Sequence, residues 1–594
     1  MNIKRYAAFA AAAVTAAVCS VTAYGAENGS EVNISIDTAK DRKAISPYIY
    51  GVNTELKREE VACKSVRTGG NRCTAYNWET NASNAGSDRE HISDDYFRQG
   101  VPQEIRDKPA CAALDLAAVC KEKNAYPLMS LQMAGYASAD MNGEVTEAEK
   151  APSDRWVRVE PAKGAEFSLE PDTGDGVVYM DELVNYLVKT LGDSQNGGIR
   201  GYSLDNEPSL WNLTHSRVHP EHTSCGELIE KSVALAKAVK AVDGGAEIFG
   251  PALFGYGAFT DFAGAPDWQE IKAANPEYRW FVDYYLDEMR KAEEENGSRL
   301  LDVLDVHYYT EAKGECGERS CRHYNKEGCV SARLNAPRSL WDGSYKEKSW
   351  IIDTGAEFFP LLPNIKSSID KYYPGTKLAV TEYDFGAPGD ISGGIAEADA
   401  LGIFAQNEVY FASLFAYDAD YQMAAINLYT NYDGNGNGFG DTLVSCESSD
   451  IERCYAYAAI NGENSDTVTL VLSNKSFDSK TTANITLDSE YDNAHLYGMN
   501  NMAARVFDMG GSEKGVVTVS GNTVTYEMEP ETVSLLVITR ESKAEFAESE
   551  GESSETAGET KSSKLKYALI GAGTAAAAVI AAVVAFTRKK STER

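Results

Sequence analysis

Between residues 48 and 420 the chain alternates short apolar runs with longer segments of helical periodicity. The apolar runs are nearly continuous and end in polar or glycine residues, which is typical of parallel strands buried on both faces. Eight such runs occur, at residues 48–53, 65–71, 126–136, 199–208, 246–257, 301–309, 376–386 and 409–420. The segments between them repeat apolar residues every three or four positions, as amphipathic helices do; clear examples are 225–242 and 279–295. This alternation predicts an α/β fold, a (β/α)8 TIM barrel, at residues 48–430.

Beyond residue 430 the pattern changes to short strands in which apolar and polar residues alternate. The stretches DTVTLVLSN, TTANITLD and TVSLLVITR are examples, and turn residues separate them. Such strands predict an antiparallel β-sandwich domain at residues 431–540. The early segment 30–47 has the same character, so we expect its strands to join the same sandwich.

The two ends of the chain have patterns of their own. Residues 1–26 place basic residues before an alanine-rich run and small residues after it, which predicts a signal peptide. Residues 541–566 are rich in Glu, Ser and Thr, so we expect a disordered acidic stalk. Residues 567–587 lack charge and basic residues follow, which predicts a C-terminal transmembrane helix with a cytoplasmic tail at 588–594. We therefore expect an exported protein at the cell surface, anchored in the plasma membrane with its globular part outside.

The composition narrows the range of partners. The chain of 594 residues has 56 Lys and Arg against 89 Asp and Glu, a net charge of -33. The electrostatic field of this net negative charge repels the phosphates of nucleic acids, so we expect no nucleic-acid partner. The aromatic residues are mostly tyrosine, 33 beside 19 Phe and 7 Trp. Flat rings with polar tips suit neutral ligands rich in hydroxyl groups.

The cysteines suit an exported protein. Removal of Cys19 with the signal peptide leaves ten of the 11 cysteines, an even number in a compartment where disulfides persist. Cys316, Cys321 and Cys329 lie in one loop. With His323 they could form a zinc site, but a paired CxxC is missing, so we favour disulfides.

A glycine-rich stretch at 431–441 has features of a calcium loop. Asp433, Asn435 and Asn437 stand at its opening positions, but Val444 takes the twelfth, where a calcium loop has a bidentate Glu. We favour a tight turn between the barrel and the sandwich, with a structural calcium ion as the alternative. No cofactor is required by any motif, and we expect no metal in the reaction.

Two carboxylates stand at the ends of predicted strands. Glu207 closes the fourth strand in SLDNEP, and Glu382 closes the seventh in AVTEYD. Reactive residues of such barrels lie at the C-terminal rim. Two convergent carboxyls, one protonated and one ionised, are what glycosidic bond cleavage uses. The alternative is that Glu207 only caps a helix before Pro208 and that Glu382 is an incidental rim charge.

Neighbouring residues are candidates to bind substrate or support these carboxyls. Asn206 precedes the proposed acid and can donate to a sugar 2-hydroxyl. His307 and Tyr309 lie two apart on one strand and so point the same way, which lets Tyr309 hydrogen-bond Glu382. Arg67 ends the second strand and can lower the pKa of Glu382. The alternatives are ordinary barrel packing for the His-Tyr pair and a surface cation for Arg67.

Further candidate substrate contacts are Asn71, Trp78, Trp211, Trp341 and Trp350. The tryptophans lie in or beside rim segments, where an indole ring could stack on a sugar. Tryptophan is more often part of a core, so we expect two of the four to touch glycan.

The body of the chain, residues 30 to 540, resembles glycoside hydrolase family 44, a family of endo-β-1,4-glucanases and xyloglucanases. The resemblance rests on long stretches, among them ISPYIYGVN, RTGGNRCTAYNWETNASNAGSD, YSLDNEPSLWNLTHSRVHP, YYPGTKLAVTEYDFG and GGIAEADALGIFA. It implies a barrel with a β-sandwich and a retaining mechanism, with Glu207 as acid/base and Glu382 as nucleophile. The chain departs from the family pattern at Asp384, where Asn is often found, at Phe415, where Trp is often found, and in its cysteine-bearing insertion at 315–330.

The leading hypothesis is a retaining, endo-acting glycoside hydrolase at the cell surface. It would cleave β-1,4-glucan backbones of plant polysaccharides, xyloglucan or other soluble β-glucans. One alternative is a xylanase or mannanase on the same barrel. Another is a non-catalytic surface adhesin that binds glycan, although such a protein has no need of an acid and nucleophile pair.

Overall fold

The computed structural model describes residues 30–540, apart from residues 55–56, 58–59, 316 and 318–319. Four expected segments lie outside the described residues: the signal peptide (1–26), the acidic stalk (541–566), the transmembrane helix (567–587) and the cytoplasmic tail (588–594). Within the described ranges, no helix has both the length and the apolar character needed to cross a bilayer. The expected fold class was therefore wrong in its transmembrane helix, and the supported fold class is a barrel with a β-sandwich.

Eight parallel strands close into a barrel. In chain order they are β3 (Gly51–Asn53), β4 (Ser65–Thr68), β7 (Tyr126–Leu131), β12 (Gly201–Leu204), β13 (Glu247–Leu253), β14 (Val303–Tyr309), β15 (Lys377–Asp384) and β16 (Phe411–Leu414). Each lies inside one of the eight predicted runs, which confirms the barrel. The strands are shorter than the runs because the rim residues after them leave the extended conformation; Asp205, directly after β12, has a φ of 62°.

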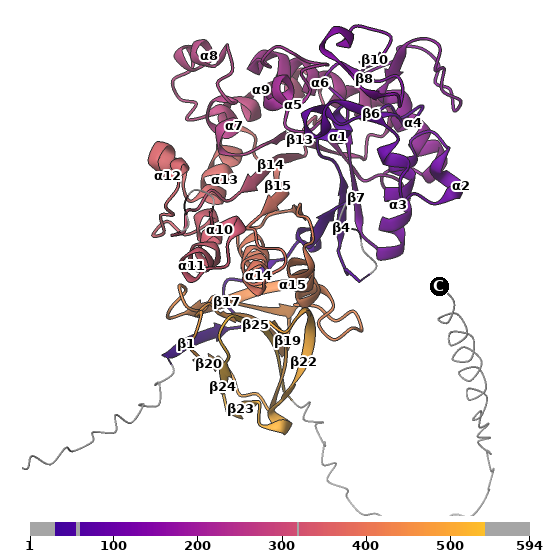
Figure 1. Cartoon of the computed structure of the whole chain (residues 1–594). Helices are drawn as coiled ribbons and strands as arrows, with labels where there is room; N and C mark the ends of the chain where they lie inside the picture. Colours follow the sequence, from indigo (N-terminus) through magenta and orange to yellow (C-terminus); the bar gives the residue numbers. More distant parts are fainter. Residues whose placement is uncertain (1–29, 55–56, 58–59, 316, 318–319, 541–594) are drawn as a thin grey trace, which may run out of the picture. The chain divides into compact units, whose positions relative to one another are not determined.

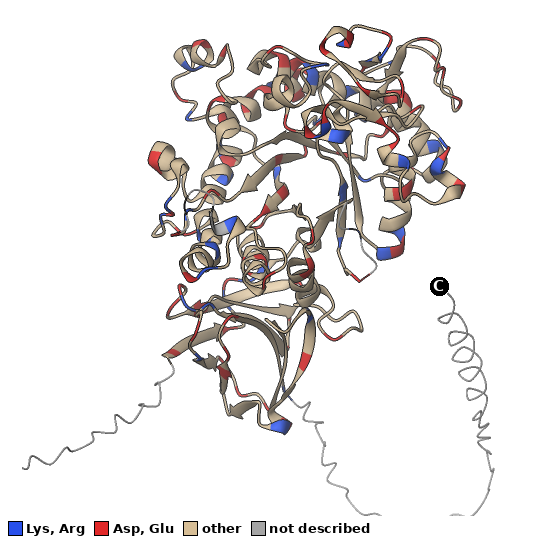
Figure 2. Ribbon diagram, viewed as in Figure 1, with Lys and Arg blue, Asp and Glu red and all other residues tan. Residues whose placement is uncertain are grey.

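Helices surround the barrel (Figure 1). The longer ones are α3 (Cys111–Lys123), α4 (Met180–Leu191), α6 (Cys225–Val242), α9 (Phe281–Asn296), α11 (Glu327–Asn335), α13 (Leu361–Tyr372), α14 (Ile391–Gln406) and α15 (Asp420–Thr430). The shorter ones are α1 (Asn71–Thr74), α2 (Gln103–Arg106), α5 (Trp211–Thr214), α7 (Tyr256–Asp261), α8 (Trp268–Ala274), α10 (Ser320–His323) and α12 (Trp350–Gly355). Acidic and basic residues are interspersed over these helices (Figure 2), so the net negative charge is not confined to one element.

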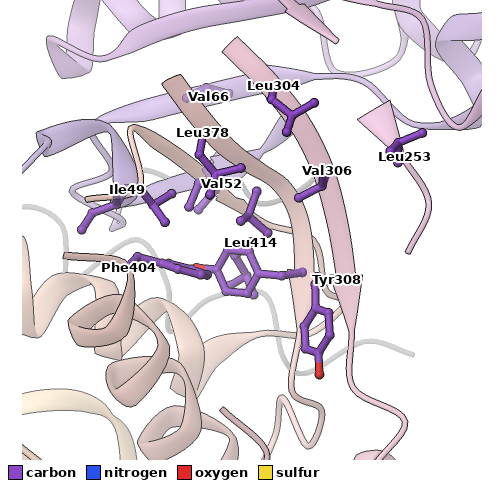
Figure 3. Packing of buried hydrophobic residues seen from close by; sticks show 14 of the residues in the cluster. Ile49, Val52, Val66, Leu253, Leu304, Val306, Tyr308, Leu378, Phe404 and Leu414 are labelled. Atoms are coloured by element: carbon purple, nitrogen blue, oxygen red, sulfur yellow. The ribbon is translucent and has the colours of Figure 1, made fainter. Parts of the chain in front are cut away.

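Apolar side chains of the strands pack against the surrounding helices. Leu304 and Val306 of β14 and Leu378 of β15 are buried in the same cluster as Phe404 of α14 (Figure 3). Because each strand also faces the barrel interior, both faces are buried, which is why the runs read as continuous apolar sequence.

Aromatic residues fill the barrel near the N-terminal ends of its strands. Tyr126, Phe249 and Phe411 pack edge to face there, with ring centroids 5.4 to 6.0 Å apart. Tyr126 and Tyr410 both donate hydrogen bonds to Glu247, at 2.6 and 2.7 Å. This end is therefore packed with side chains, and reactive groups can reach solvent only at the opposite rim.

The remaining strands form the β-sandwich. Their order is β22 (Ala503–Gly511), β21 (Asn493–Asn500), β25 (Thr532–Thr539), β19 (Asn464–Asn474), β18 (Ala456–Asn461), β17 (Thr442–Ser448), β1 (Ser30–Asp37), β20 (Thr481–Leu487), β24 (Thr523–Met528) and β23 (Val517–Ser520), with β2 (Lys43–Ala44) beside β17. Strand β17 pairs with β18 through its first residues and with β1 through its last, so it connects the two layers. Val32, Ile34, Val468, Leu470 and Ile485 are buried between them.

The N-terminal strand lies inside this sandwich. Strand β1 pairs with β17 on one side and with β20 on the other. The pairing with β20 is parallel, so the sheet is not antiparallel throughout, in contrast to the expectation. Two small three-stranded sheets lie beside the barrel sheet. One is formed by β5 (Ser83–Asn84), β6 (Ile92–Asp94) and β9 (Gly143–Glu144), the other by β8 (Tyr136–Ser138), β10 (Trp156–Glu160) and β11 (Val177–Tyr179).

The glycine-rich stretch joins α15 to β17 as a tight turn. Asp433 accepts hydrogen bonds from the backbone of Asn435 and the amide of Asn437, and Gly434 and Gly436 adopt positive φ angles. These are the features of the favoured turn. The structural calcium ion stays a prediction.

The cysteines follow the expectation only in part. Cys329 is disulfide-bonded, so it offers no thiolate to the zinc site considered above. Cys446 and Cys454, which flank a polar turn, carry free thiols.

Candidate active site

Glu207 lies in a turn of unusual backbone conformation directly after β12. Asp205 and Glu207 have φ angles of 62° and 45°. Residues other than glycine adopt such angles at a cost of about 1–3 kcal/mol each, and they cluster at functional sites. The Asp205 carboxylate holds the turn by accepting hydrogen bonds from Thr74 Oγ1 at 2.6 Å and from the Met133 backbone at 2.5 Å. The turn leaves 14% of the Glu207 side chain exposed.

Glu382 lies on β15 and accepts hydrogen bonds from two other barrel strands, the adjacent β14 and the more distant β4. Its Oε1 accepts a hydrogen bond from Arg67 Nη1 at 2.7 Å, and its Oε2 accepts one from Tyr309 OH at 2.7 Å. Arg67 belongs to β4 and Tyr309 to β14, so the barrel itself positions both donors. Only 6% of the Glu382 side chain is exposed.

His307 lies between the two carboxyls. Its Nδ1 is 2.9 Å from Glu207 Oε1 and 3.6 Å from Glu382 Oε2. One ligating atom from each of the three side chains lies within 4.8 Å of the others. This upper bound is below the 6.5 Å or more that separates the carboxyls of inverting glycosidases, and it is compatible with the separation of about 5–5.5 Å in retaining ones.

The two carboxyls have pKa values shifted in opposite directions. Burial raises the pKa of Glu207, and the nearby charge of Glu382 raises it further, although His307 offsets part of the rise. Burial also acts on Glu382, but the charges of His307 and Arg67 and the hydrogen bonds from Arg67 and Tyr309 outweigh it and lower its pKa. These opposite shifts favour the protonated form of Glu207 and the ionised form of Glu382, which is the division of roles that an acid and a nucleophile need.

Arg67 links Glu382 to two asparagines. Its Nη2 donates to Asn206 Oδ1 at 2.7 Å, and its Nη1 also lies 3.2 Å from Asn53 Oδ1. The side chain is fully buried, so the alternative of a surface cation was wrong. A Cβ at Gly69 would overlap the guanidinium carbon, so the glycine makes room for the arginine.

Asn206 and Asn71 are brought together at the rim. Asn206 Nδ2 donates to Asn71 Oδ1 at 3.2 Å, and Asn71 Nδ2 donates to Asp88 Oδ2 at 3.0 Å. Since Arg67 occupies the carbonyl oxygen of Asn206, its amide nitrogen is the group left for a sugar hydroxyl.

Two supporting residues escaped the sequence analysis. Asn53 closes the first strand in GVN. Asp305 is fully buried on β14, two residues before His307, and accepts hydrogen bonds from Thr381 Oγ1 at 2.6 Å and Ser203 Oγ at 3.2 Å. Its charge helps to raise the pKa of Arg67. The period-2 position of Asp305 relative to His307 was the available signal, because both side chains face the barrel interior.

The four tryptophans do not act alike. Trp78 and Trp211 are fully buried, so neither offers a ring face to a sugar, in contrast to the expectation. Trp341 is half-buried in a cavity next to the sandwich, away from the catalytic carboxyls. Trp350 is 43% exposed, and its Nε1 donates to Glu311 Oε2 at 3.1 Å, just beyond the end of β14.

Aromatic side chains also follow β16. A Cβ at Gly70 would lie 3.9 Å from the ring of Phe415, so this ring lies close to the loop after β4. Tyr417, which the sequence analysis missed, is 71% exposed, and its ring centroid is 6.0 Å from that of Phe415. Phe415, Tyr417 and Trp350 are thus candidates among the described residues for stacking on a sugar.

Within the part of the chain that the structure describes, Glu207, His307 and Glu382 are also the one group of acidic or histidine side chains spaced closely enough to hold a metal ion. Arg67 already neutralises Glu382, and His307 already bonds Glu207. Each of the three side chains is therefore already paired with a neighbouring charged or polar group.

A (β/α)8 barrel that presents two carboxyls at this separation, with pKa values shifted in opposite directions, defines the class of the protein: it is a glycoside hydrolase. The model of the glycoside hydrolase family 44 matches residues 74–312. Endoglucanase A of Paenibacillus lautus is 46% identical over 511 residues, which are 84% of this chain and 71% of that protein.

Solved structures agree with this match. A family 44 endoglucanase from Clostridium thermocellum is 49% identical, with a TM-score of 0.82. A family 44 xyloglucanase from Paenibacillus polymyxa, solved with xyloglucan, is 45% identical, with a TM-score of 0.83. Both alignments cover 86% of this chain and 100% of the other. The chain belongs to glycoside hydrolase family 44, and it is an endo-acting glycoside hydrolase.

Proposed function

We propose that the enzyme cleaves β-1,4-glucan backbones, xyloglucan or other soluble β-glucans of plants, with retention at the anomeric carbon. The observation that carries the retaining mechanism is the short separation of the Glu207 and Glu382 carboxyls, within 4.8 Å between ligating atoms. The substrate class is supported by the endoglucanase and xyloglucanase relatives.

In the first step Glu382 attacks the anomeric carbon and forms a covalent glycosyl-enzyme. Glu207 gives its proton to the departing glycosidic oxygen, so that the leaving chain departs as a neutral alcohol. The amide of Asn206 donates to the 2-hydroxyl, a contact that strengthens as positive charge develops at the anomeric carbon. Arg67 and Tyr309 keep Glu382 ionised and aligned before the attack.

In the second step Glu207, now a carboxylate, takes a proton from water, and the water oxygen attacks the anomeric carbon. Glu382 leaves as a carboxylate and recovers its hydrogen bonds from Arg67 and Tyr309. His307 contacts both carboxyls. Burial disfavours its imidazolium form, but the charge of Glu382 and the hydrogen bond and charge of Glu207 outweigh burial and raise its pKa. His307 can therefore carry a positive charge beside whichever carboxyl is ionised.

The substrate is tested by release of reducing ends from xyloglucan, carboxymethylcellulose, xylan and mannan. We expect the highest rate on a β-1,4-glucan and a rapid fall of polymer viscosity, as endo cleavage gives. A higher rate on xylan or mannan would show that the enzyme is a xylanase or a mannanase instead. No release from any of the four polymers would favour a non-catalytic adhesin that binds glycan. Proton NMR of the first product formed distinguishes retention, which gives the β-anomer, from inversion.

We further propose that the enzyme is exported and acts outside the cell. Residues 1–26 have the composition of a signal peptide, and a polysaccharide is too large to enter a cell undegraded. N-terminal sequencing of protein secreted by the native host should begin close to residue 27, and a mature chain that keeps residues 1–26 would contradict the export.

A further inference from the structure

Arg322 brings a guanidinium close to the nucleophile from a segment outside the barrel strands. It lies on α10, within the cysteine-bearing insertion at 315–330. Its Nη2 donates to Asp384 Oδ2 at 3.0 Å, and its Cζ lies 5.2 Å from the ring centroid of Tyr309. The backbone is fitted as closely: Ala387 N donates to Arg322 O at 3.1 Å, and a Cβ at Gly386 would overlap Arg322 Cα.

Asp384 places a second acid beside Glu382. The two lie two residues apart on β15, so their side chains share one face of the strand. The Asp384 side chain is 9% exposed, and its Oδ1 accepts hydrogen bonds from Gln422 Nε2 and from the Gly386 backbone, both at 2.7 Å. In the described part of the chain, Arg322 is the only cation that forms an ion pair with Asp384. The charge that a carboxylate would add next to the nucleophile is therefore offset from the insertion.

The same guanidinium contacts the hydrogen-bond donor of the nucleophile. Tyr309 OH donates to Glu382 Oε2 at 2.7 Å, while the ring of Tyr309 lies beside Arg322. Other ionisable groups near Asp384 are Tyr383 on the same strand and Glu397 on α14, whose pKa burial raises to about 8. Neither Tyr383 nor Glu397 adds positive charge there.

We propose that Arg322 is a positioning residue for the hydrolysis, which offsets the Asp384 carboxylate and braces the Tyr309 ring, so that Glu382 stays ionised and correctly oriented. The proposal rests on the proposed function of Glu382 as nucleophile. It also gives the insertion a role: it supplies the cation that an acid at position 384 requires.

The test is a double-mutant cycle of Arg322→Gln and Asp384→Asn, measured as kcat/KM on the preferred glucan across the pH range. In the otherwise unchanged enzyme, Arg322→Gln should lower kcat/KM about tenfold. It should also move the acid limb of the profile up by about 0.5–1 pH unit, because an uncompensated carboxylate raises the pKa of its neighbour. In the Asp384→Asn background the same replacement should cost about twofold or less, since the offending charge is gone. Arg322→Lys, which keeps the charge, should retain most of the activity.

An equal loss from Arg322→Gln in both backgrounds, an unmoved acid limb, or an unchanged kcat/KM would each overturn the proposal. Should Arg322→Gln alone fail to fold, as judged by circular dichroism, the comparison of Arg322→Lys with the double variant decides. If the double variant then has a lower kcat/KM than Arg322→Lys while its acid limb is unmoved, Arg322 does not act by offsetting the charge of Asp384. Failure of the proposed function looks different, because the unaltered enzyme would then release no reducing ends from any glucan.

Discussion

The residues around Glu207 and Glu382 give two identical functional groups different tasks. Desolvation raises the pKa of both carboxyls. Of the two carboxyls, Arg67 and Tyr309 bond Glu382, whereas the hydrogen bond that the described residues give the Glu207 carboxyl comes from His307. In the proposed mechanism this difference in donors decides which carboxyl is the nucleophile.

Replacement of the two carboxyls tests this division directly. Glu382→Gln should lower kcat by about 10⁴-fold or more on every substrate, because no glycosyl-enzyme can form. Glu207→Gln should cost about 10²–10⁴-fold on polymer, as loss of a general acid does. On an aryl glycoside with a good leaving group, Glu207→Gln should still show a burst of released phenol. Equal behaviour of the two variants on that substrate would contradict the assignment.

The pH profile depends on His307. Its positive charge lowers the pKa of both Glu382 and Glu207. In the proposed mechanism, activity should fall below the pKa of Glu382, where the nucleophile becomes protonated, and above the pKa of Glu207, where the acid loses its proton. His307→Asn should therefore move both limbs of the kcat/KM profile to higher pH, by about one unit. Limbs that move apart or toward lower pH would show that His307 acts otherwise.

At the scale of elements, strand ends and the turns after them build the site. Strands β4, β12, β14 and β15 each contribute, through Arg67, the Asp205–Glu207 turn, His307 with Tyr309, and Glu382. The loop after β4 shows how closely the side chains of the site are packed, because only a glycine at position 69 leaves space for the Arg67 guanidinium.

Gly69→Ala should displace the Arg67 guanidinium and break its bond to Glu382. We expect kcat to fall by about 10–10³-fold, while the folded state loses about 1–3 kcal/mol from crowding. The matched control is Gly389→Ala, where a Cβ meets nothing within 4 Å. Chemical denaturation and reducing-end release measure the two effects, and comparable activity of both variants would refute the role of Gly69.

The sequence predicted the strands better than the contacts that side chains make between them. Apolar runs located all eight barrel strands, because a strand that is buried on both faces consists of consecutive apolar residues. Glu207 and Glu382 followed from their positions at strand ends. Trp78 and Trp211 could not be placed from sequence, since a stacking and a core tryptophan look alike until packing is known. Asn53 was missed because its contact with Arg67 joins two strands, a pairing that no local pattern records.

At the scale of the whole molecule, the barrel and the sandwich share buried polar contacts. Lys475 of the sandwich lies 3.3 Å from Asp399 of α14, and both side chains are almost fully buried. Tyr457 OH also donates to Asp399, at 2.7 Å. The barrel and the sandwich therefore belong to one compact unit.

Lys475→Met should destabilise the protein by about 3–5 kcal/mol, because it leaves the Asp399 carboxyl buried without its cation. The double variant Lys475→Met, Asp399→Asn should recover part of that loss. Since the pair is remote from the catalytic carboxyls, kcat of the folded fraction should stay within about twofold for both variants. Thermal unfolding checks the first expectation, and an unaltered unfolding midpoint for Lys475→Met would disprove it.

The position of β1 has a consequence for how the molecule is made. During synthesis Ser30–Asp37 emerges among the first residues, yet its neighbours Thr442–Ser448 and Thr481–Leu487 follow only after the entire barrel. The sandwich is therefore completed last, by capture of the earliest strand, and a ribosome that stalls before residue 480 releases a chain with an open sheet edge.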